Sequence, residues 1–131
     1  MRLVERLMAS MRTMNITYRQ NILISQQDKL IPLPVSTVAF FYVDGRQVTA
    51  TTLTGKEYRV DMTLDELQEQ LNPVSFFRVN RQYIVQHVAV KELTQWFSGK
   101  YVLGLSVAAP EKIVIPKAKV TPLKEWLAVG E

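Results

Sequence analysis

The fold depends on residues 38–45, which read Val38-Ala39-Phe40-Phe41-Tyr42-Val43-Asp44-Gly45. The first six form an unbroken apolar run, which is typical of a strand covered on both faces. Asp44-Gly45 is a strong hairpin signal, because a type I′ turn needs positive φ and glycine tolerates it. Residues 47–53 are rich in β-branched side chains and supply the expected return strand. The sequence therefore predicts a β-hairpin whose first strand lies in the core.

Strand patterns continue on both sides of this hairpin. Upstream, apolar and polar residues alternate from Ile16 to Ser25, which predicts a half-buried strand there. Residues 30–33 favour an edge strand, because Pro32 within the segment and Pro34 after it have no N–H to donate to a ladder. Further strands are expected at residues 57–60, 76–79, 85–97, 101–107 and 112–115.

Two short helices are indicated by their N-terminal residues. Thr63 can cap the first, and Glu66 completes a reciprocal capping box three residues later. The second is expected to follow Thr121, with Pro122 in its first position. The fold class is therefore mostly β, with elongated antiparallel sheets and two short helices.

The N-terminal segment, residues 1–14, has the apolar stripe of an amphipathic helix. Two interpretations stay open: a terminal helix that packs on its own domain, or a linker helix from a missing upstream domain. The remaining residues, 15–131, have the length of one globular domain.

Composition excludes several kinds of site. The chain has no cysteine and a single histidine, His87, which argues against thiolate nucleophiles and against Cys-ligated or multi-histidine metal sites. Acidic residues gather near the first helix, where an exposed acidic face is a better interpretation than an acid–base pair: Asp61, Asp65, Glu66 and Glu69. We expect no enzyme activity, cofactor or metal. No long apolar segment or signal peptide is evident, so a cytoplasmic protein without membrane contact is expected.

The excess of positive charge lies entirely in the second half of the chain. Residues 1–74 hold eight Arg and Lys against eight Asp and Glu, whereas residues 75–131 hold eight against four. Such asymmetry suits a polyanionic partner. Long basic and amide side chains also fall in three expected connections, and from a rigid β scaffold they could reach DNA grooves. These residues are Arg46 and Gln47, Asn80, Arg81 and Gln82, and Lys117 and Lys119.

The run Phe76-Phe77-Arg78-Val79-Asn80-Arg81-Gln82-Tyr83-Ile84-Val85 resembles the central signature of LytTR DNA-binding domains. The flanking regions agree: residues 38–43 are similar to the family's first core strand, and residues 115–119 to the loop before its final helix. The resemblance covers about residues 30–128.

This resemblance implies a transcription regulator that places loops, instead of a recognition helix, in successive major grooves of double-stranded DNA. The family's base-reading positions correspond to Arg46, Gln47, Asn80, Arg81 and Lys119. Candidates for phosphate contacts are Arg78, Lys100 and Lys117. In the family the last loop usually reads serine-arginine; here it is Ala118-Lys119, and lysine lacks the bidentate fork of arginine.

LytTR domains commonly form the output domain of bacterial two-component response regulators, behind a receiver domain in a phosphorelay. The resemblance therefore implies an upstream receiver domain, binding to paired direct repeats, and a possible homodimer. The geometric requirement is that the three connections converge on one side of the molecule.

Two other interpretations remain. A single-strand-binding β-barrel would use aromatic side chains as stacking platforms beside Arg78 and Lys100: Phe76, Phe77, Trp96, Phe97 and Tyr101. A β-sheet interaction module would instead add a peptide to the edge at residues 30–33.

Overall fold

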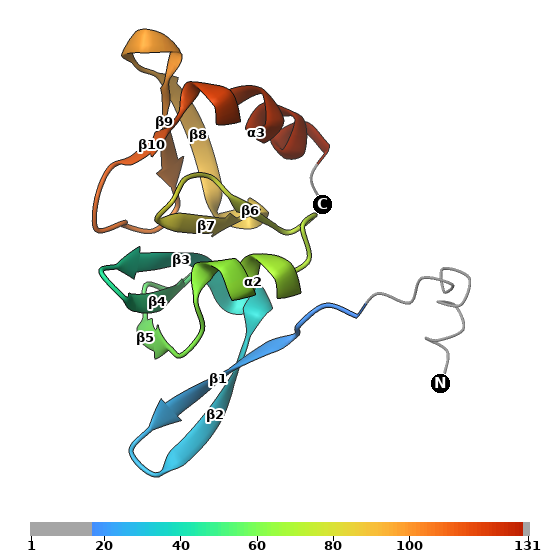
Figure 1. Cartoon of the computed structure of the whole chain (residues 1–131), viewed down its shortest axis with the longest axis vertical. Coiled ribbons are helices and arrows are strands. Elements are labelled where there is room, and N and C mark those ends of the chain that lie inside the picture. The colour runs from blue at the N-terminus through green and yellow to red at the C-terminus, as the bar shows by residue number, and fades with distance from the viewer. Residues whose placement is uncertain (1–16, 130–131) are drawn as a thin grey trace, which may run out of the picture.

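The computed structural model of the chain describes residues 17–129, in which three antiparallel sheets follow one another along the long axis (Figure 1). A ribbon of β1 (Asn21–Gln26) and β2 (Lys29–Pro34) projects at one end. A five-stranded sheet with strand order β5-β4-β3-β7-β6 lies in the middle, and a three-stranded sheet with order β10-β9-β8 lies beyond it. The expected mostly β, elongated fold is confirmed.

The strands of the two larger sheets have the following bounds. The central sheet contains β3 (Val38–Asp44), β4 (Gln47–Thr52), β5 (Glu57–Val60), β6 (Phe76–Arg78) and β7 (Tyr83–Gln86). The three-stranded sheet contains β8 (Val90–Gln95), β9 (Tyr101–Leu105) and β10 (Ile113–Ile115). The helices are α2 (Leu64–Gln70) and α3 (Lys117–Val129), and short 3₁₀ turns span Val35–Thr37, His87–Ala89 and Phe97–Gly99.

Strand β3 is the centre of the molecule and is covered on both faces, as its apolar run predicts. Phe41 packs with α2 and with the buried side of the ribbon, whereas Phe40 packs with β10 and α3. A β-bulge between Val38 and Phe40 shifts the alternation, so that Val38 joins the cluster of Phe41 and not that of Phe40. Two apolar cores therefore share one strand.

The capping box of α2 is confirmed atom by atom. The Thr63 hydroxyl accepts from the Glu66 N–H at 3.1 Å, and the Glu66 carboxylate accepts from the Thr63 N–H at 3.0 Å. Leu64, Leu67 and Leu71 are buried against β3, which fixes the helix on the central sheet.

The hairpin after β3 forms, but its turn is one residue later than expected. Asp44 pairs with Gln47, so the two turn residues are Gly45 and Arg46. Gly45 has a φ of +65°, while Arg46 is not among the described residues with positive φ. This combination fits a type II′ turn and excludes the predicted type I′.

The predicted strand over residues 16–25 begins only at Asn21. The Val35 N–H donates to the Gln20 carbonyl at 2.9 Å, and this is the last backbone hydrogen bond between the two chain segments of the ribbon. The chain before Gln20 turns to α2 instead, where the Arg19 N–H donates to the Gln70 carbonyl at 2.9 Å.

The predicted strand over residues 85–97 is two strands, because the chain passes from one sheet to another. β7 pairs with β3 and β6, whereas β8 pairs with β9. The 3₁₀ turn His87–Ala89 makes this change of direction.

The last helix begins at Lys117, four residues before the predicted cap at Thr121. Val120 and Leu123 are both buried in the core that contains Phe40, and their spacing of three residues places them on one face of a helix. Pro122 therefore lies inside α3, on its exposed side.

The expected linker helix at residues 1–14 lies outside the described residues. Between residues 17 and 129, no helix has both the length and the apolar character needed to cross a membrane.

Candidate nucleic-acid interface

Two predicted DNA-reading loops lie at the same end of the central sheet. Tyr42 of β3 pairs with Tyr83 of β7, and the Val43 N–H donates to the Gln82 carbonyl at 3.0 Å. The tip of the β3–β4 hairpin and the connection between β6 and β7, residues 79–82, therefore leave the sheet side by side (Figure 1). We call residues 79–82 the Arg81 loop.

The first turn of α3 joins the Arg81 loop. The Asn80 amide nitrogen donates to the Val114 carbonyl of β10 at 3.0 Å, just before the helix begins. One open hollow is lined by both segments, together with the end of β6 and a residue of α2: Gln68, Arg78, Asn80, Arg81, Gln82, Pro116 and Lys119. Two of the three predicted connections thus meet around one hollow.

Both polar atoms of the Asn80 side chain form hydrogen bonds that hold the loop. Its amide oxygen accepts from the N–H groups of Gln82 at 2.9 Å and Tyr83 at 3.0 Å, while its nitrogen binds Val114. Arg81 and Gln82 are left exposed beside it. The Asn80 amide is therefore engaged within the protein, unlike that of a side chain free to read a base.

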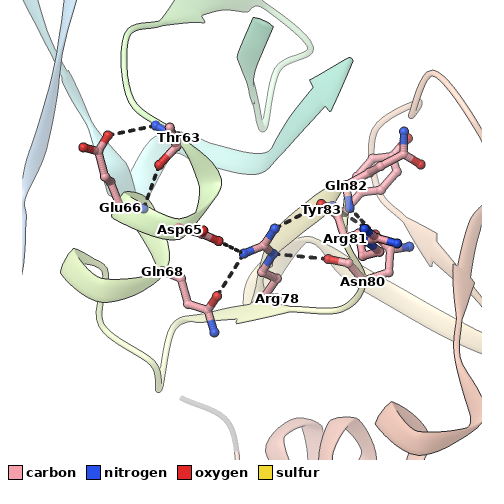
Figure 2. Close-up of polar contacts among 9 residues, drawn as sticks. All are labelled: Thr63, Asp65, Glu66, Gln68, Arg78, Asn80, Arg81, Gln82 and Tyr83. Carbon is pink, nitrogen blue, oxygen red and sulfur yellow. Dashed lines mark hydrogen bonds and ion pairs between the residues drawn. The ribbon is translucent and has the colours of Figure 1, made fainter. Parts of the chain in front are cut away.

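Arg78 is also engaged by the protein (Figure 2). Its guanidinium donates to the carbonyls of Asn80 at 3.3 Å and Arg81 at 3.1 Å. On its other side it donates to the Asp65 carboxylate at 2.6 Å and to the Gln68 side chain at 3.1 Å. Only 21% of the Arg78 side chain is exposed, so most of the predicted phosphate-contacting group faces other parts of the chain.

The hairpin presents the exposed Arg46 side chain and the hydrogen-bonded amide of Gln47. Arg46 is exposed in the turn, whereas the Gln47 amide oxygen accepts from the guanidinium of Arg59 on β5. The Gln47 nitrogen donates to the Val48 carbonyl at 2.7 Å. Gln47 lines a different hollow from Arg81, bounded in part by Pro110.

The predicted site lysines, Lys100, Lys117 and Lys119, belong to the first turn of α3 and to the hairpin beside it. Lys117 and Lys119 lie in the first helical turn and not in the loop that the sequence predicts. The Lys119 ammonium lies 5.7 Å from the centre of the Phe77 ring. A Cβ on Gly99 would lie 3.1 Å from the Lys117 side chain, which places the β8–β9 hairpin, with Lys100 at its end, beside this turn. Lys117 and Lys119 therefore lie in the first turn of α3, and Lys100 follows a hairpin glycine that lies beside Lys117.

The aromatic residues considered as stacking platforms lie in separate parts of the molecule. Phe76 is buried, and Phe77 packs on Trp126 with ring centres 5.1 Å apart. Trp96 and Phe97 are exposed at the tip of the other hairpin, 4.5 Å from each other. This arrangement does not favour the single-strand-binding interpretation.

His87 packs against helix α3 and contributes to the structure of the domain. Its ring packs edge-on against Trp126 at 4.9 Å, and its Nε2 lies 3.2 Å from the Leu127 carbonyl. Over the described part of the chain, no group of three or more His, Cys, Asp or Glu side chains could hold a metal ion.

Sequence reasoning missed three residues that bind side chains of the predicted DNA-contacting segments: Arg59, Asp65 and Gln68. Asp65 and Gln68 belong to the helix that the sequence indicates as an exposed acidic face. No local pattern links them to Arg78, because the contact depends on how α2 packs on the sheet.

Comparison with known proteins agrees with this geometry. Two curated relatives are longer proteins. The Sensory transduction protein LytT of Oceanobacillus iheyensis is 27% identical over 96 residues, which make up 73% of this chain and 39% of that protein. The Transcriptional regulatory protein LytR of Staphylococcus aureus is 32% identical over 59 residues, 45% of this chain and 24% of that protein. The chain spans less than half the length of these relatives.

A solved LytTr DNA-binding domain from Bacillus cereus has the same fold, with a TM-score of 0.69 at 17% identity. The likeness covers 83% of this chain and 97% of that domain. The family model of the LytTr DNA-binding domain matches residues 28–128, which is most of the chain. The chain belongs to the LytTr DNA-binding domain family.

Proposed function

We propose that this domain binds double-stranded DNA in a sequence-specific manner, as the output domain of a two-component transcriptional response regulator in the cytoplasm. One observation carries the proposal: exposed Arg46 and Arg81 lie at the same end of the central sheet, and Lys119 lines the same hollow as Arg81. An arginine on a rigid loop can bind the guanine edge with two hydrogen bonds in the major groove.

We propose different roles for the candidate residues, and the geometry supports this division. We assign base contacts to Arg46, Arg81 and Lys119, and to Gln47 once its amide leaves Arg59. Asn80 shapes the loop between them. Lys100 and Lys117 are assigned to phosphates. Cations in a first helical turn oppose the positive end of the helix dipole, and an anionic partner relieves that repulsion.

The relatives' greater length leaves room for further domains, and we propose that one is an upstream receiver domain. We further propose that two copies of the domain bind paired direct repeats, with a homodimer as the form that presents them.

The test compares Arg81→Ala with Lys100→Ala. Duplexes are selected from a random pool with the wild-type chain, and the selected duplex is then measured against random DNA. Arg81→Ala should cost about 1–3 kcal/mol on the selected duplex and little on random DNA. Lys100→Ala should weaken both equally, because phosphate contacts carry no sequence information. Equal losses for both variants would contradict the assignment.

Salt dependence and strand competition complete the test. If about five phosphates are neutralised, affinity should fall roughly 10²- to 10³-fold between 50 and 200 mM salt. A single strand that competes as well as the duplex would overturn the proposal.

A further inference from the structure

The Arg81 loop needs a support that is not local. It leaves the sheet between β6 and β7, and its residues are in neither helix nor strand. Its backbone is closed by the Val79 N–H, which donates to the Tyr83 carbonyl at 3.1 Å. The carbonyls of Asn80 and Arg81 both accept hydrogen bonds from the Arg78 guanidinium. Arg78 therefore fixes the peptide that carries the Arg81 side chain.

Arg78 is itself held by helix α2, as Figure 2 shows. The Asp65 carboxylate and the Gln68 side chain both accept from its Nη1. The planar guanidinium can bridge helix and loop because its donors point in fixed, divergent directions. A lysine at this position would offer one ammonium and could not serve both sides.

Asp65 is an unusual residue to find beside a DNA-binding surface. Its side chain is 86% exposed, and its carboxylate pairs with Arg78, which lines the same hollow as Arg81 and Lys119. A negative charge at that place repels DNA phosphates. An ion pair whose acidic partner lies in solvent is screened by water and contributes little to stability, so the fold alone does not account for Asp65.

We propose that Asp65 and Arg78 are positioning residues for DNA sequence recognition: Asp65 orients the Arg78 guanidinium, which holds the Arg81 loop in its base-reading conformation. This inference rests on the proposed function. It replaces the expected phosphate contact of Arg78 with a role that acts through Arg81.

The first experiment compares Asp65→Asn with Glu69→Gln on the same helix. Both remove one negative charge, but Glu69 is exposed and forms no ion pair with another described residue. The measured quantity is the specificity ratio, the Kd for random duplex divided by the Kd for the selected duplex. Asp65→Asn should lower this ratio about 3- to 10-fold, a part of the factor expected for one base-reading pair. Glu69→Gln should leave it unchanged.

A purely electrostatic role for Asp65 predicts a different result. Loss of the charge would then strengthen binding to both duplexes equally, with the ratio unchanged in both variants. That outcome overturns the inference while leaving the proposed function intact. A wild-type chain with no preference for its selected duplex overturns both.

The second experiment uses Arg78→Lys, which keeps the charge. A phosphate contact would survive this change, and so would the salt dependence of binding. Positioning predicts instead a specificity ratio about tenfold lower, with the salt slope unaltered. In an Arg81→Ala background the same change should alter the ratio less than about twofold, because the two residues act as a unit. Equal effects in both backgrounds, or a wild-type ratio in Arg78→Lys, overturn the inference.

Discussion

The two loops that present arginines at the end of the central sheet are built in different ways. The β3–β4 hairpin turns in two residues, and its form follows from the ladder between Asp44 and Gln47 and from the positive φ of Gly45. The Arg81 loop takes four residues and depends on side chains that bind β10 and α2. One loop is determined by its own sequence, and the other by the tertiary structure around it.

This difference has a consequence for DNA recognition. The Arg81 loop is held by hydrogen bonds that involve both β10 and α2. Its arginine therefore has less conformational entropy to lose on binding DNA. Arg46 has no comparable support in the described structure, since its neighbour Gln47 is occupied by Arg59. We therefore expect sequence discrimination to depend more on Arg81 than on Arg46.

The largest effect is expected for Asn80→Ala, which removes the side-chain hydrogen bonds that hold the Arg81 loop. The change removes three hydrogen bonds, and it leaves the Val114 carbonyl and two backbone N–H groups without that partner. We expect the free energy of unfolding to fall by about 2 kcal/mol, measured by urea denaturation. The specificity ratio should fall at least tenfold, because Arg81 loses its fixed peptide.

Gln82→Ala is the matched control for this prediction. Gln82 is exposed in the same loop and is bonded there through its backbone. Its truncation should change the free energy of unfolding by less than about 0.5 kcal/mol. If Asn80→Ala were equally mild, the loop would not depend on distant side chains.

A smaller effect is expected for Gly45→Ala, which strains the local hairpin. Gly45 has a φ of +65°, and no atom lies within 4 Å of the place its Cβ would take. The cost is therefore backbone strain alone, about 1 kcal/mol in the free energy of unfolding. The specificity ratio should fall no more than about twofold, because the ladder still holds the ends of the turn.

Gly55→Ala separates strain from recognition. Gly55 has a φ of +90° and equally open space, but it lies in the turn between β4 and β5. It should destabilise the fold to a similar extent and leave DNA discrimination as in the wild type. A loss of discrimination in Gly55→Ala would show that global stability, and not the hairpin tip, controls recognition.

The same contrast between local and tertiary causes explains what the sequence could predict. The apolar run of β3 and the capping box of Thr63 and Glu66 are local patterns, and the structure confirms both. The locations of the connections at residues 46 and 80–82 were also predictable, because turn residues separate strand patterns there. The last helix was placed too late, because the N-terminal preference of proline outweighed the need to bury Val120.

The support of the candidate site could not be predicted in this way. Arg78 and Asp65 are 13 residues apart, and Asn80 and Val114 are 34 apart. Periodicity describes which face of an element is buried, but it does not show which polar side chains meet when elements pack. Arg78 therefore looked like a free cation in the sequence and is a bound one in the structure.

The smallest effect concerns a contact beneath both loops, and it depends on pH. The Tyr42 hydroxyl donates to the Glu111 carboxylate at 2.8 Å, and this hydrogen bond, together with burial, raises the pKa of Tyr42 to about 12. Burial also raises the pKa of Tyr83, whose hydroxyl donates to the Glu111 carbonyl at 3.2 Å. Both loops therefore share one support, in which the tyrosines must stay protonated.

The sign of the effect follows from linkage. An unfolded tyrosine loses its proton near pH 10, before native Tyr42 does, so the native state binds more protons between pH 10 and 12. The free energy of unfolding should fall as the pH rises through this range. Tyr42→Phe should make that fall shallower, because a titrating group is removed. Tyr101→Phe should make it steeper, because hydrogen bonds from Gln95 and Lys124 lower the pKa of Tyr101. Urea denaturation at pH 9, 10 and 11 measures both slopes, and an unchanged slope in Tyr42→Phe would refute a shared support beneath the two loops.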